Sequence, residues 1–262
     1  MVSTEKRSLR AYLRGRMEEG GPLIIGYLPG LYPDEESFDR ELELLLEHGI
    51  AALEVGIPGR TPPLEGDTIS SALKTVSDAV PDPLRVMRLS VALTNCHGAY
   101  PIAMAFAETV EEIGLERFVR EAGAAGSSAL LVPDLPENRR GRLHELATEE
   151  GMQTVLFQGA EEAPKRVYGS EAFMYVQTAD MPTGGRFEPT EELAERVAEL
   201  RETSRVEGEA LPLALGFGIR ERGDVEAAQG LGADIAIVGT ALVEAAARGI
   251  EEFRQYLMEL SG

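Results

Sequence analysis

The sequence contains little of what disulfide-linked or membrane-spanning proteins need. Its 262 residues include one cysteine, Cys96, which excludes an intramolecular disulfide and leaves no thiolate cluster for a metal. No apolar run approaches the roughly 18 residues that a membrane-spanning helix requires. Residues 1–20 are charged and helix-like and lack the apolar core of a signal peptide. We therefore expect a cytoplasmic protein that does not enter a membrane.

Positive charge is also scarce. The chain has 25 Lys and Arg residues against 45 Asp and Glu residues, which gives a formal net charge of −20. Such a surface repels nucleic acid, so we expect no nucleic-acid partner. An anionic ligand would have to be bound by backbone amides or by a few local charges. The three histidines, His48, His97 and His144, do not have the spacing of a metal site, so we expect no bound metal.

What the chain does have is a regular alternation of short apolar runs and longer amphipathic segments. Near-continuous apolar runs are typical of strands in a parallel sheet that is buried on both faces. The predicted strands are residues 22–28, 50–57, 101–106, 128–136, 152–158, 172–177, 211–219 and 233–242. The predicted helices between them are residues 34–49, 67–79, 114–126, 137–151, 162–169, 190–204 and 222–232, with a further helix after the last strand.

Eight strand–helix units in a chain of this length predict one closed (β/α)₈ barrel domain over residues 1–262, with an extra helix at the N-terminus. The alternative is an open doubly wound sheet. That fold usually has about five or six strands and a glycine-rich turn after the first, whereas here the glycine-rich turns follow the sixth, seventh and eighth predicted strands. Residues 79–98 are expected to be helical in part.

Two glycine-rich turns suggest a phosphate site. They read "LGFGI" after the seventh predicted strand and "VGTAL" after the eighth, where barrels of this type often bind phosphate. Glycines let the backbone approach an anion closely, and the start of the following helix adds a positive dipole end. The candidate donors are Gly218, Ile219, Gly239 and Thr240. The alternative is that these glycines serve only tight turns.

Two acids follow the second predicted strand. Glu54 lies within an apolar run near the carboxyl end of that strand, which is the end where barrels carry their catalytic groups. A carboxyl group in an apolar pocket has a raised pKa and can exchange protons near neutral pH. The alternative role for Glu54 is a structural ion pair with Arg60. Glu65, on the next loop, is either a second functional acid or a solvated surface residue. Tyr175, near the end of the sixth strand, is either a ligand donor or a core tyrosine.

Several of these stretches together resemble the tryptophan synthase alpha chain family, in order over roughly residues 20–245. "ALEVGIP" with the later "GDTI" is similar to the family's second-strand signature, and "GLERFVREAGAAG" with "LLVPDLP" to its third helix and fourth loop. "PTGGR" is similar to its mobile sixth loop, and "LGFGI…VGTAL" to its phosphate loops. The resemblance implies a cofactor-free barrel that cleaves indole-3-glycerol phosphate to indole and glyceraldehyde 3-phosphate and works with a beta chain.

The resemblance also implies roles for particular residues. Glu54 matches the catalytic glutamate, and Glu65 stands where the family has an aspartate that contacts the ring nitrogen. Tyr175 and Thr183 match substrate-site positions, and Phe106 replaces a family residue that faces the substrate or the beta chain. The positions that match the phosphate site are Gly184, Phe217, Gly218, Ile219, Gly239 and Thr240.

The chain departs from the family pattern in three loops. The loop after the second strand reads "GRTPPLEGD", with Thr61 in place of one aspartate and the longer Glu65 in place of the other. "FAET" follows the third strand, and Ala179 and Met181 stand in the sixth loop. Two alternatives therefore remain open: a related barrel lyase or isomerase with a different phosphorylated substrate, and a non-catalytic partner of a beta chain.

Overall fold

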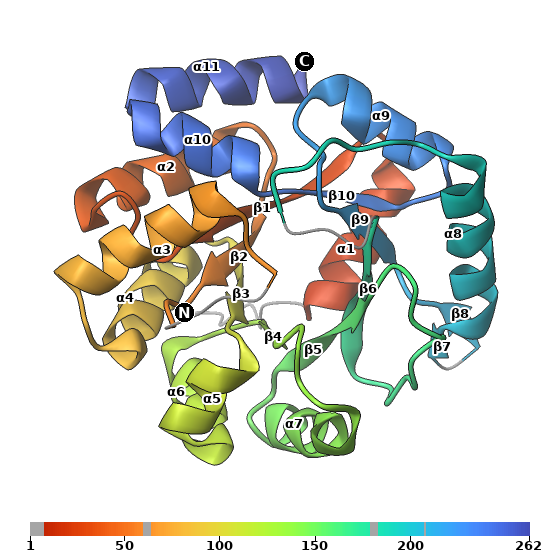
Figure 1. The fold of residues 1–262 in the computed structure, drawn as a ribbon, viewed down its shortest axis with the longest axis horizontal. Helices are drawn as coiled ribbons and strands as arrows, with labels where there is room; N and C mark the ends of the chain where they lie inside the picture. Colours follow the sequence, from red (N-terminus) through yellow and green to blue (C-terminus); the bar gives the residue numbers. More distant parts are fainter. Residues whose placement is uncertain (1–7, 60–63, 179–182, 207) are drawn as a thin grey trace, which may run out of the picture.

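The computed structural model describes residues 8–59, 64–178, 183–206 and 208–262. Within them, eight parallel strands close into a barrel in the order β1-β10-β9-β6-β5-β4-β3-β2 (Figure 1). This confirms the predicted (β/α)₈ barrel and contradicts the open doubly wound sheet. The barrel strands are β1 Leu23–Pro29, β2 Ala52–Gly56, β3 Tyr100–Met104, β4 Ala129–Leu131, β5 Gln153–Gln158, β6 Glu171–Gln177, β9 Leu213–Gly216 and β10 Ile235–Val238.

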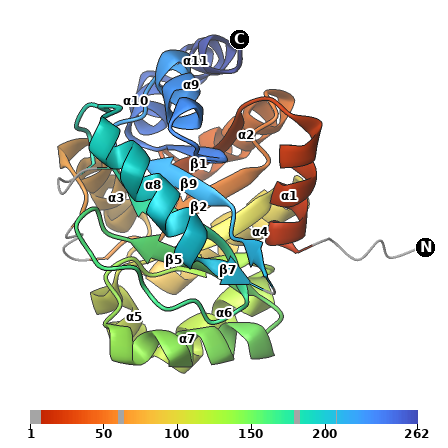
Figure 2. The same cartoon turned by 90° about the vertical axis from the view of Figure 1, so that its right-hand side faces the viewer.

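Helices surround the barrel on the outside, as the two perpendicular views show (Figures 1 and 2). Those after the first strand are α2 Glu35–Glu47, α3 Asp67–Ala79, α4 Pro83–Cys96, α5 Ala107–Ile113, α6 Leu115–Ala125, α7 Glu137–Glu149, α8 Glu191–Thr203, α9 Arg222–Gly230, α10 Thr240–Arg248 and α11 Ile250–Ser261. Among the described residues, no helix is both long enough and apolar enough to cross a membrane.

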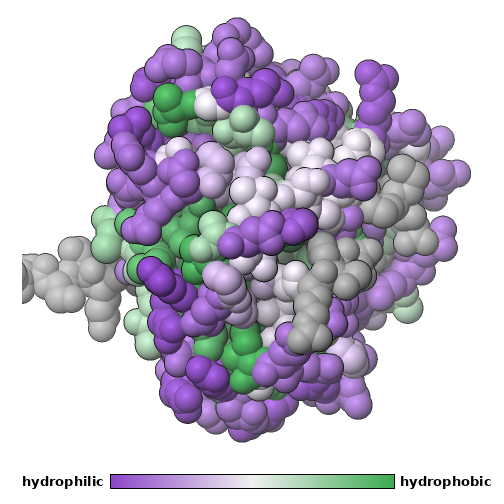
Figure 3. Space-filling view, turned by 60° about the vertical axis from the view of Figure 1, so that its left-hand side comes forward, coloured by the Kyte–Doolittle hydropathy of each residue, from purple (hydrophilic) through white to green (hydrophobic). Residues whose placement is uncertain are grey.

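Burial follows from the sequence pattern. Every residue of β1, β2 and β6 is buried, because one face of each strand lines the barrel interior and the other packs against helices. The helices contribute amphipathic faces; α2, for example, buries Phe38, Leu42 and Leu45. Hydrophilic side chains dominate the face shown in Figure 3, with hydrophobic residues gathered in small patches between them.

The predicted N-terminal helix is confirmed as α1, Leu9–Glu19, and it covers the amino-terminal end of the barrel. Ser8 caps it through a hydrogen bond from the Ala11 amide. The amide of Arg10 donates to the Gln153 side chain at 2.9 Å, at the start of β5. The Tyr12 ring stacks on Tyr100, at the start of β3, with 4.4 Å between ring centroids. Because α1 covers this end, it is the carboxyl end of the barrel that is left to hold a ligand.

The predicted helix at 162–169 is wrong: the segment between β5 and β6 is irregular. The buried Gln158 side chain binds its backbone instead, donating to the carbonyls of Glu162 and Ala163 and accepting from the Lys165 amide. The Glu171 carboxylate accepts from the two amides at 168 and 169. Side chains of the two flanking strands therefore satisfy backbone groups that a helix would have paired internally.

Other differences concern short elements. The partly helical segment 79–98 contains α4, which Asp82 caps and Pro83 begins. The predicted strand 128–136 shortens to Ala129–Leu131, and the helical part of 233–242 begins at Thr240. Two elements were not predicted: the seven-residue α5 and a small antiparallel ribbon of β7, Arg205–Val206, and β8, Glu209–Ala210. The single helix predicted after the last strand is divided into α10 and α11.

Candidate active site

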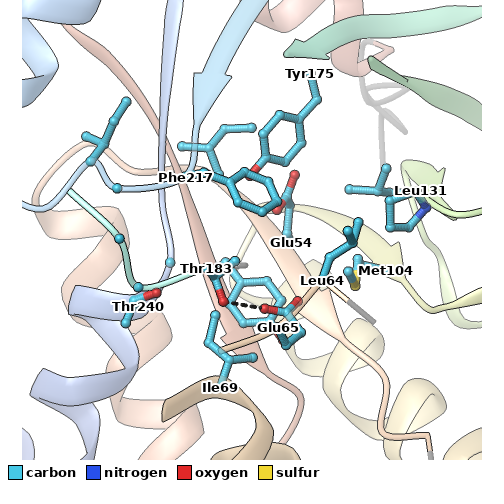
Figure 4. A pocket seen from close by; sticks show the side chains of 18 of the residues that line it. Glu54, Leu64, Glu65, Ile69, Met104, Leu131, Tyr175, Thr183, Phe217 and Thr240 are labelled. Carbon is cyan, nitrogen blue, oxygen red and sulfur yellow. Dashed lines mark hydrogen bonds between the residues drawn. The ribbon is translucent and has the colours of Figure 1, made fainter. Parts of the chain in front are cut away.

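A cavity opens at the carboxyl end of the barrel and brings together nearly all the predicted site residues (Figure 4). Its volume is about 600 Å³, counted to the open mouth. Both acids and both predicted phosphate loops contribute to its walls. The predicted residues that line it are Glu54, Glu65, Tyr175, Thr183, Gly184, Phe217, Gly218, Ile219, Gly239 and Thr240.

Glu54 projects from β2 into this cavity and is 3% exposed. Its neighbours in the strand register are Tyr27 on β1 and Ile102 on β3. Oε1 of Glu54 has no hydrogen-bond partner among the described residues. Burial raises the pKa of Glu54 well above its usual value, and the nearby Glu65 carboxylate raises it further. Burial therefore favours the protonated form of the side chain, which can act as a proton donor. The alternative partner, Arg60, lies outside the described residues.

Glu65 is joined to the sixth loop by Thr183. The Thr183 hydroxyl donates to Oε2 of Glu65 at 2.8 Å and accepts from the Gly66 amide at 2.9 Å. The Thr183 amide donates to the Leu64 carbonyl at 3.0 Å. Burial raises the pKa of Glu65 to about 7, and the hydrogen bond from Thr183 opposes that rise. Glu65 is thus a cavity acid that is half ionised near neutral pH, and not a solvated surface residue.

The two glycine-rich turns form the wall near β9 and β10. Phe217 and Gly218 both have positive φ, 76° and 90°, a backbone that is strained for a phenylalanine. The turn is held by the Thr178 hydroxyl, which donates to the Phe217 carbonyl at 2.7 Å, and by the Phe187 amide, which donates to the Gly218 carbonyl at 3.2 Å.

The second turn leads directly into α10, with Gly239 as the residue before the helix and Thr240 as its first residue. The first amides of an α-helix have no partner inside the helix, and the helix dipole places positive charge there. This end of the cavity can therefore bind an anion through backbone groups, as the sequence predicts.

Aromatic rings line the remaining wall. The Tyr175 ring contacts Phe157 edge-on at 5.3 Å between centroids and Phe217 at 6.0 Å. The Tyr175 ring reaches across Gly216 on β9, where an added Cβ would overlap it. Burial, and then the charges of Glu54 and Glu65, raise the pKa of Tyr175 well above its usual value, so its phenol keeps the proton. This wall suits a flat apolar ligand with a polar edge.

Comparison with known proteins identifies the family. The sequence model of the tryptophan synthase alpha chain matches residues 13–261. The chain belongs to this family. The tryptophan synthase alpha chain of Thermococcus kodakarensis is 32% identical over 94% of this chain and 98% of its own length. That of Mycobacterium marinum is 29% identical over 93% and 89% respectively.

Solved structures agree with this assignment to the tryptophan synthase alpha chain family. Mycobacterium tuberculosis tryptophan synthase superposes with a TM-score of 0.81 at 26% identity, covering 97% of this chain and 95% of the other. The tryptophan synthase complex of Pyrococcus furiosus gives a TM-score of 0.74 at 25% identity, covering 92% and 96%. The barrel of this alpha-chain family member is therefore similar to theirs over nearly its whole length.

One predicted substrate residue of this alpha-chain family member is not among those that line the cavity. Phe106 is buried just before α5, where its backbone begins that helix. Phe106 was assigned to the substrate site only through the family resemblance, at the end of the predicted strand 101–106. Arg60, Thr61, Ala179 and Met181, where the chain departs from the family pattern, lie outside the described residues.

Two cavity residues with polar side chains were not predicted from the sequence, Tyr27 and Arg220. Tyr27 of β1 lines the cavity beside Glu54. Arg220, directly after "GFGI", also lines it and forms an ion pair with Glu244, so a cation does stand at the phosphate end. The positions of both residues could have indicated them: Tyr27 lies two residues before the end of β1, and Arg220 directly follows a predicted phosphate turn.

None of the described residues that line the cavity is a histidine. Nor do the described residues contain a group of three or more side chains suited to a metal ion.

Proposed function

We propose that this protein cleaves indole-3-glycerol phosphate to indole and glyceraldehyde 3-phosphate by a retro-aldol reaction, as a step of tryptophan biosynthesis. The observation that carries the proposal is the pair of acids in one cavity with an anion-binding end. Burial raises the pKa of Glu54 well above its usual value and raises that of Glu65 to about 7. Burial thus favours the protonated form of Glu54, while Glu65 can be ionised near neutral pH, and such a difference supports Glu54 as the proton donor and Glu65 as the charge stabiliser.

The lining of the cavity supports one orientation for this substrate. Its phosphate is bound by the turns after β9 and β10, through the backbone at Gly218, Gly239 and Thr240. The apolar side chains Met104 and Leu131 come from β3 and β4, which lie across the barrel in the strand order. The indole ring therefore extends toward β3 and β4, over the end of β2, where Glu54 is placed.

The reaction follows from the protonation states. Protonated Glu54 transfers its proton to carbon 3 of the indole, and the ring nitrogen becomes positive. The ionised Glu65 accepts a hydrogen bond from the ring N–H and stabilises that charge. The Glu54 carboxylate then removes the proton from the side-chain hydroxyl, the carbon–carbon bond breaks, and its electron pair restores the neutral ring. Glu54 regains the proton it gave, so no other acid or base is needed.

We also propose that residues 1–262 act as a single domain in the cytoplasm with a tryptophan synthase beta chain as partner. The similarity to the tryptophan synthase complex of Pyrococcus furiosus supports a partner of this kind. A closed sixth loop would exclude water from the cavity, and the bonds between Thr183 and residues 64–66 already join the two loops.

An indole-release assay tests the function. Purified protein is incubated with indole-3-glycerol phosphate, alone and with a tryptophan synthase beta chain. We expect slow release alone and faster release with the partner. The absence of indole in both mixtures would refute the proposal. A thermal-shift screen of other phosphorylated compounds on the same sample would then identify a different substrate, whereas complex formation without turnover would identify a non-catalytic partner.

A further inference from the structure

Two buried polar atoms face the same cavity and have no partner among the described residues: the Tyr27 hydroxyl and Oε1 of Glu54. Tyr27 is 4% exposed, and its position on β1 is in register with Glu54 on β2, so both side chains project into the barrel. Buried hydroxyl and carboxyl groups normally have hydrogen-bond partners. The Tyr27 hydroxyl can donate a hydrogen bond, and Oε1 of Glu54 can accept one.

The strand geometry places the hydroxyl close to Glu54. An added Cβ on Gly56 would overlap the Tyr27 hydroxyl, which therefore lies directly over Gly56. Glu54 and Gly56 are two residues apart on β2, so they point to the same face, one pleat from each other. The Tyr27 hydroxyl, which comes from β1, and Oε1 of Glu54 therefore lie over the same face of β2. Both atoms are shielded from solvent.

The phenol acts as a donor that keeps its proton. Burial, followed by the charges of Glu65, Glu54 and Tyr175, raises the pKa of Tyr27 well above its usual value. Glu65 already accepts a hydrogen bond from Thr183, whereas Oε1 of Glu54 has no partner among the described residues. Within the described part of the chain, Oε1 of Glu54 is therefore the carboxyl oxygen that can still take a donor when the group is charged.

We propose that Tyr27 is a positioning residue whose hydroxyl donates a hydrogen bond to Oε1 of Glu54 when Glu54 is ionised. The inference rests on the proposed function, in which Glu54 gives its proton to the indole ring and takes one back from the side-chain hydroxyl. Tyr27 neither gains nor loses a proton in either step. Its bond forms with the charge that appears on Glu54 and therefore favours the reacting state over the resting one.

The test measures the pKa of Glu54 in ligand-free protein, from the carboxyl ¹³C shift of glutamate-labelled samples, with Glu54→Gln to assign the signal. Tyr27→Phe removes only the hydroxyl. We expect it to raise the pKa of Glu54 by about one to two units, the size of one hydrogen bond to a charged group. Gly56→Ala, which displaces the hydroxyl, should shift it in the same direction. Tyr32→Phe is the matched control, because Tyr32 follows the same strand but is not among the residues that line the cavity.

Kinetics provide the second measurement. Tyr27→Phe should lower kcat for indole release about tenfold with little change in KM, because the bond is made only in the reacting state. An unchanged Glu54 pKa in Tyr27→Phe would overturn the inference, as would a shift of the Glu65 pKa alone. A rise of the Glu54 pKa in Tyr175→Phe but not in Tyr27→Phe would overturn it as well. If the Glu54 pKa rises in Tyr27→Phe but no sample releases indole, the hydrogen bond is upheld and the proposed substrate is refuted instead.

Discussion

Replacing Thr183 by valine should move the pH dependence of the reaction without removing the active site. Valine keeps the shape of threonine, and the Thr183 amide can still donate to the Leu64 carbonyl. What is lost is the hydroxyl, which donates to Oε2 of Glu65 at 2.8 Å. A hydrogen bond to a charged group contributes about 1.5–3 kcal/mol, which corresponds to about one to two pKa units. Without it, the pKa of Glu65 rises from about 7 by that amount.

The direction of the pH effect follows from the charge that Glu65 must carry. Its pKa is already raised, so the ionised form that stabilises the ring nitrogen is present only above about pH 7. In Thr183→Val the same form appears about one to two pH units higher. We expect kcat/KM for indole release to fall about tenfold or more at pH 7 and to approach the wild-type value at higher pH.

The assay is a pH profile of kcat/KM for Thr183→Val beside Thr183→Ser. Serine keeps the hydroxyl, so its profile should follow the wild type. A loss in Thr183→Val that is equal at every pH would refute this reasoning. It would show that Thr183 acts by holding the two loops together and not through the charge of Glu65.

Three further outcomes are expected. Glu41 of α2 is 1% exposed, and its burial, together with the charge of Asp34, raises its pKa to about 8. In the unfolded chain the Glu41 carboxyl has a pKa near 4.5. The stability that the neutral carboxyl contributes below pH 4.5 is therefore lost as the pH rises toward 8. In urea unfolding, Glu41→Gln should remove this decline and be more stable above pH 8 by at most about 5 kcal/mol, whereas a parallel decline in both proteins would contradict it. Gln158→Leu should lower the free energy of unfolding by about 2–3 kcal/mol, because three backbone groups lose a partner; a change under about 0.5 kcal/mol would exclude that role. Gly218→Ala should weaken calorimetric binding of glyceraldehyde 3-phosphate at least tenfold, because its φ is +90° and a Cβ would overlap the Phe187 backbone; unchanged affinity would place the phosphate elsewhere.

The barrel could be predicted because strands buried on both faces leave a simple signal. Each barrel strand begins within a residue or two of the start of an apolar run in the sequence, and the turn after β9 contains Gly218, whose φ of +90° favours glycine. The helix predicted at 162–169 failed because Gln158 binds that segment's backbone from outside it. Such a contact leaves no periodic pattern in the sequence.

The two acids could be placed from sequence because a strand end and its own loop must lie close together. The surroundings of each acid could not be predicted from the sequence. The bond from Thr183 to Glu65 joins residues 118 positions apart, and the position of the Tyr27 hydroxyl depends on the missing side chain of Gly56 on the neighbouring strand. Phe106 was assigned to the substrate site through the family resemblance, and no capping side chain marks the start of the short α5 that begins after it.

The central claim is that this protein breaks the carbon–carbon bond of indole-3-glycerol phosphate with a proton from Glu54. The most direct test follows indole and glyceraldehyde 3-phosphate together in one reaction, for the wild type and for Glu54→Gln, with a beta chain present. We expect equimolar products from the wild type and a loss of about 100-fold or more in Glu54→Gln, the usual contribution of a positioned acid–base group. Equal rates in the two proteins would contradict the role of Glu54, and no product from the wild type would contradict the activity itself.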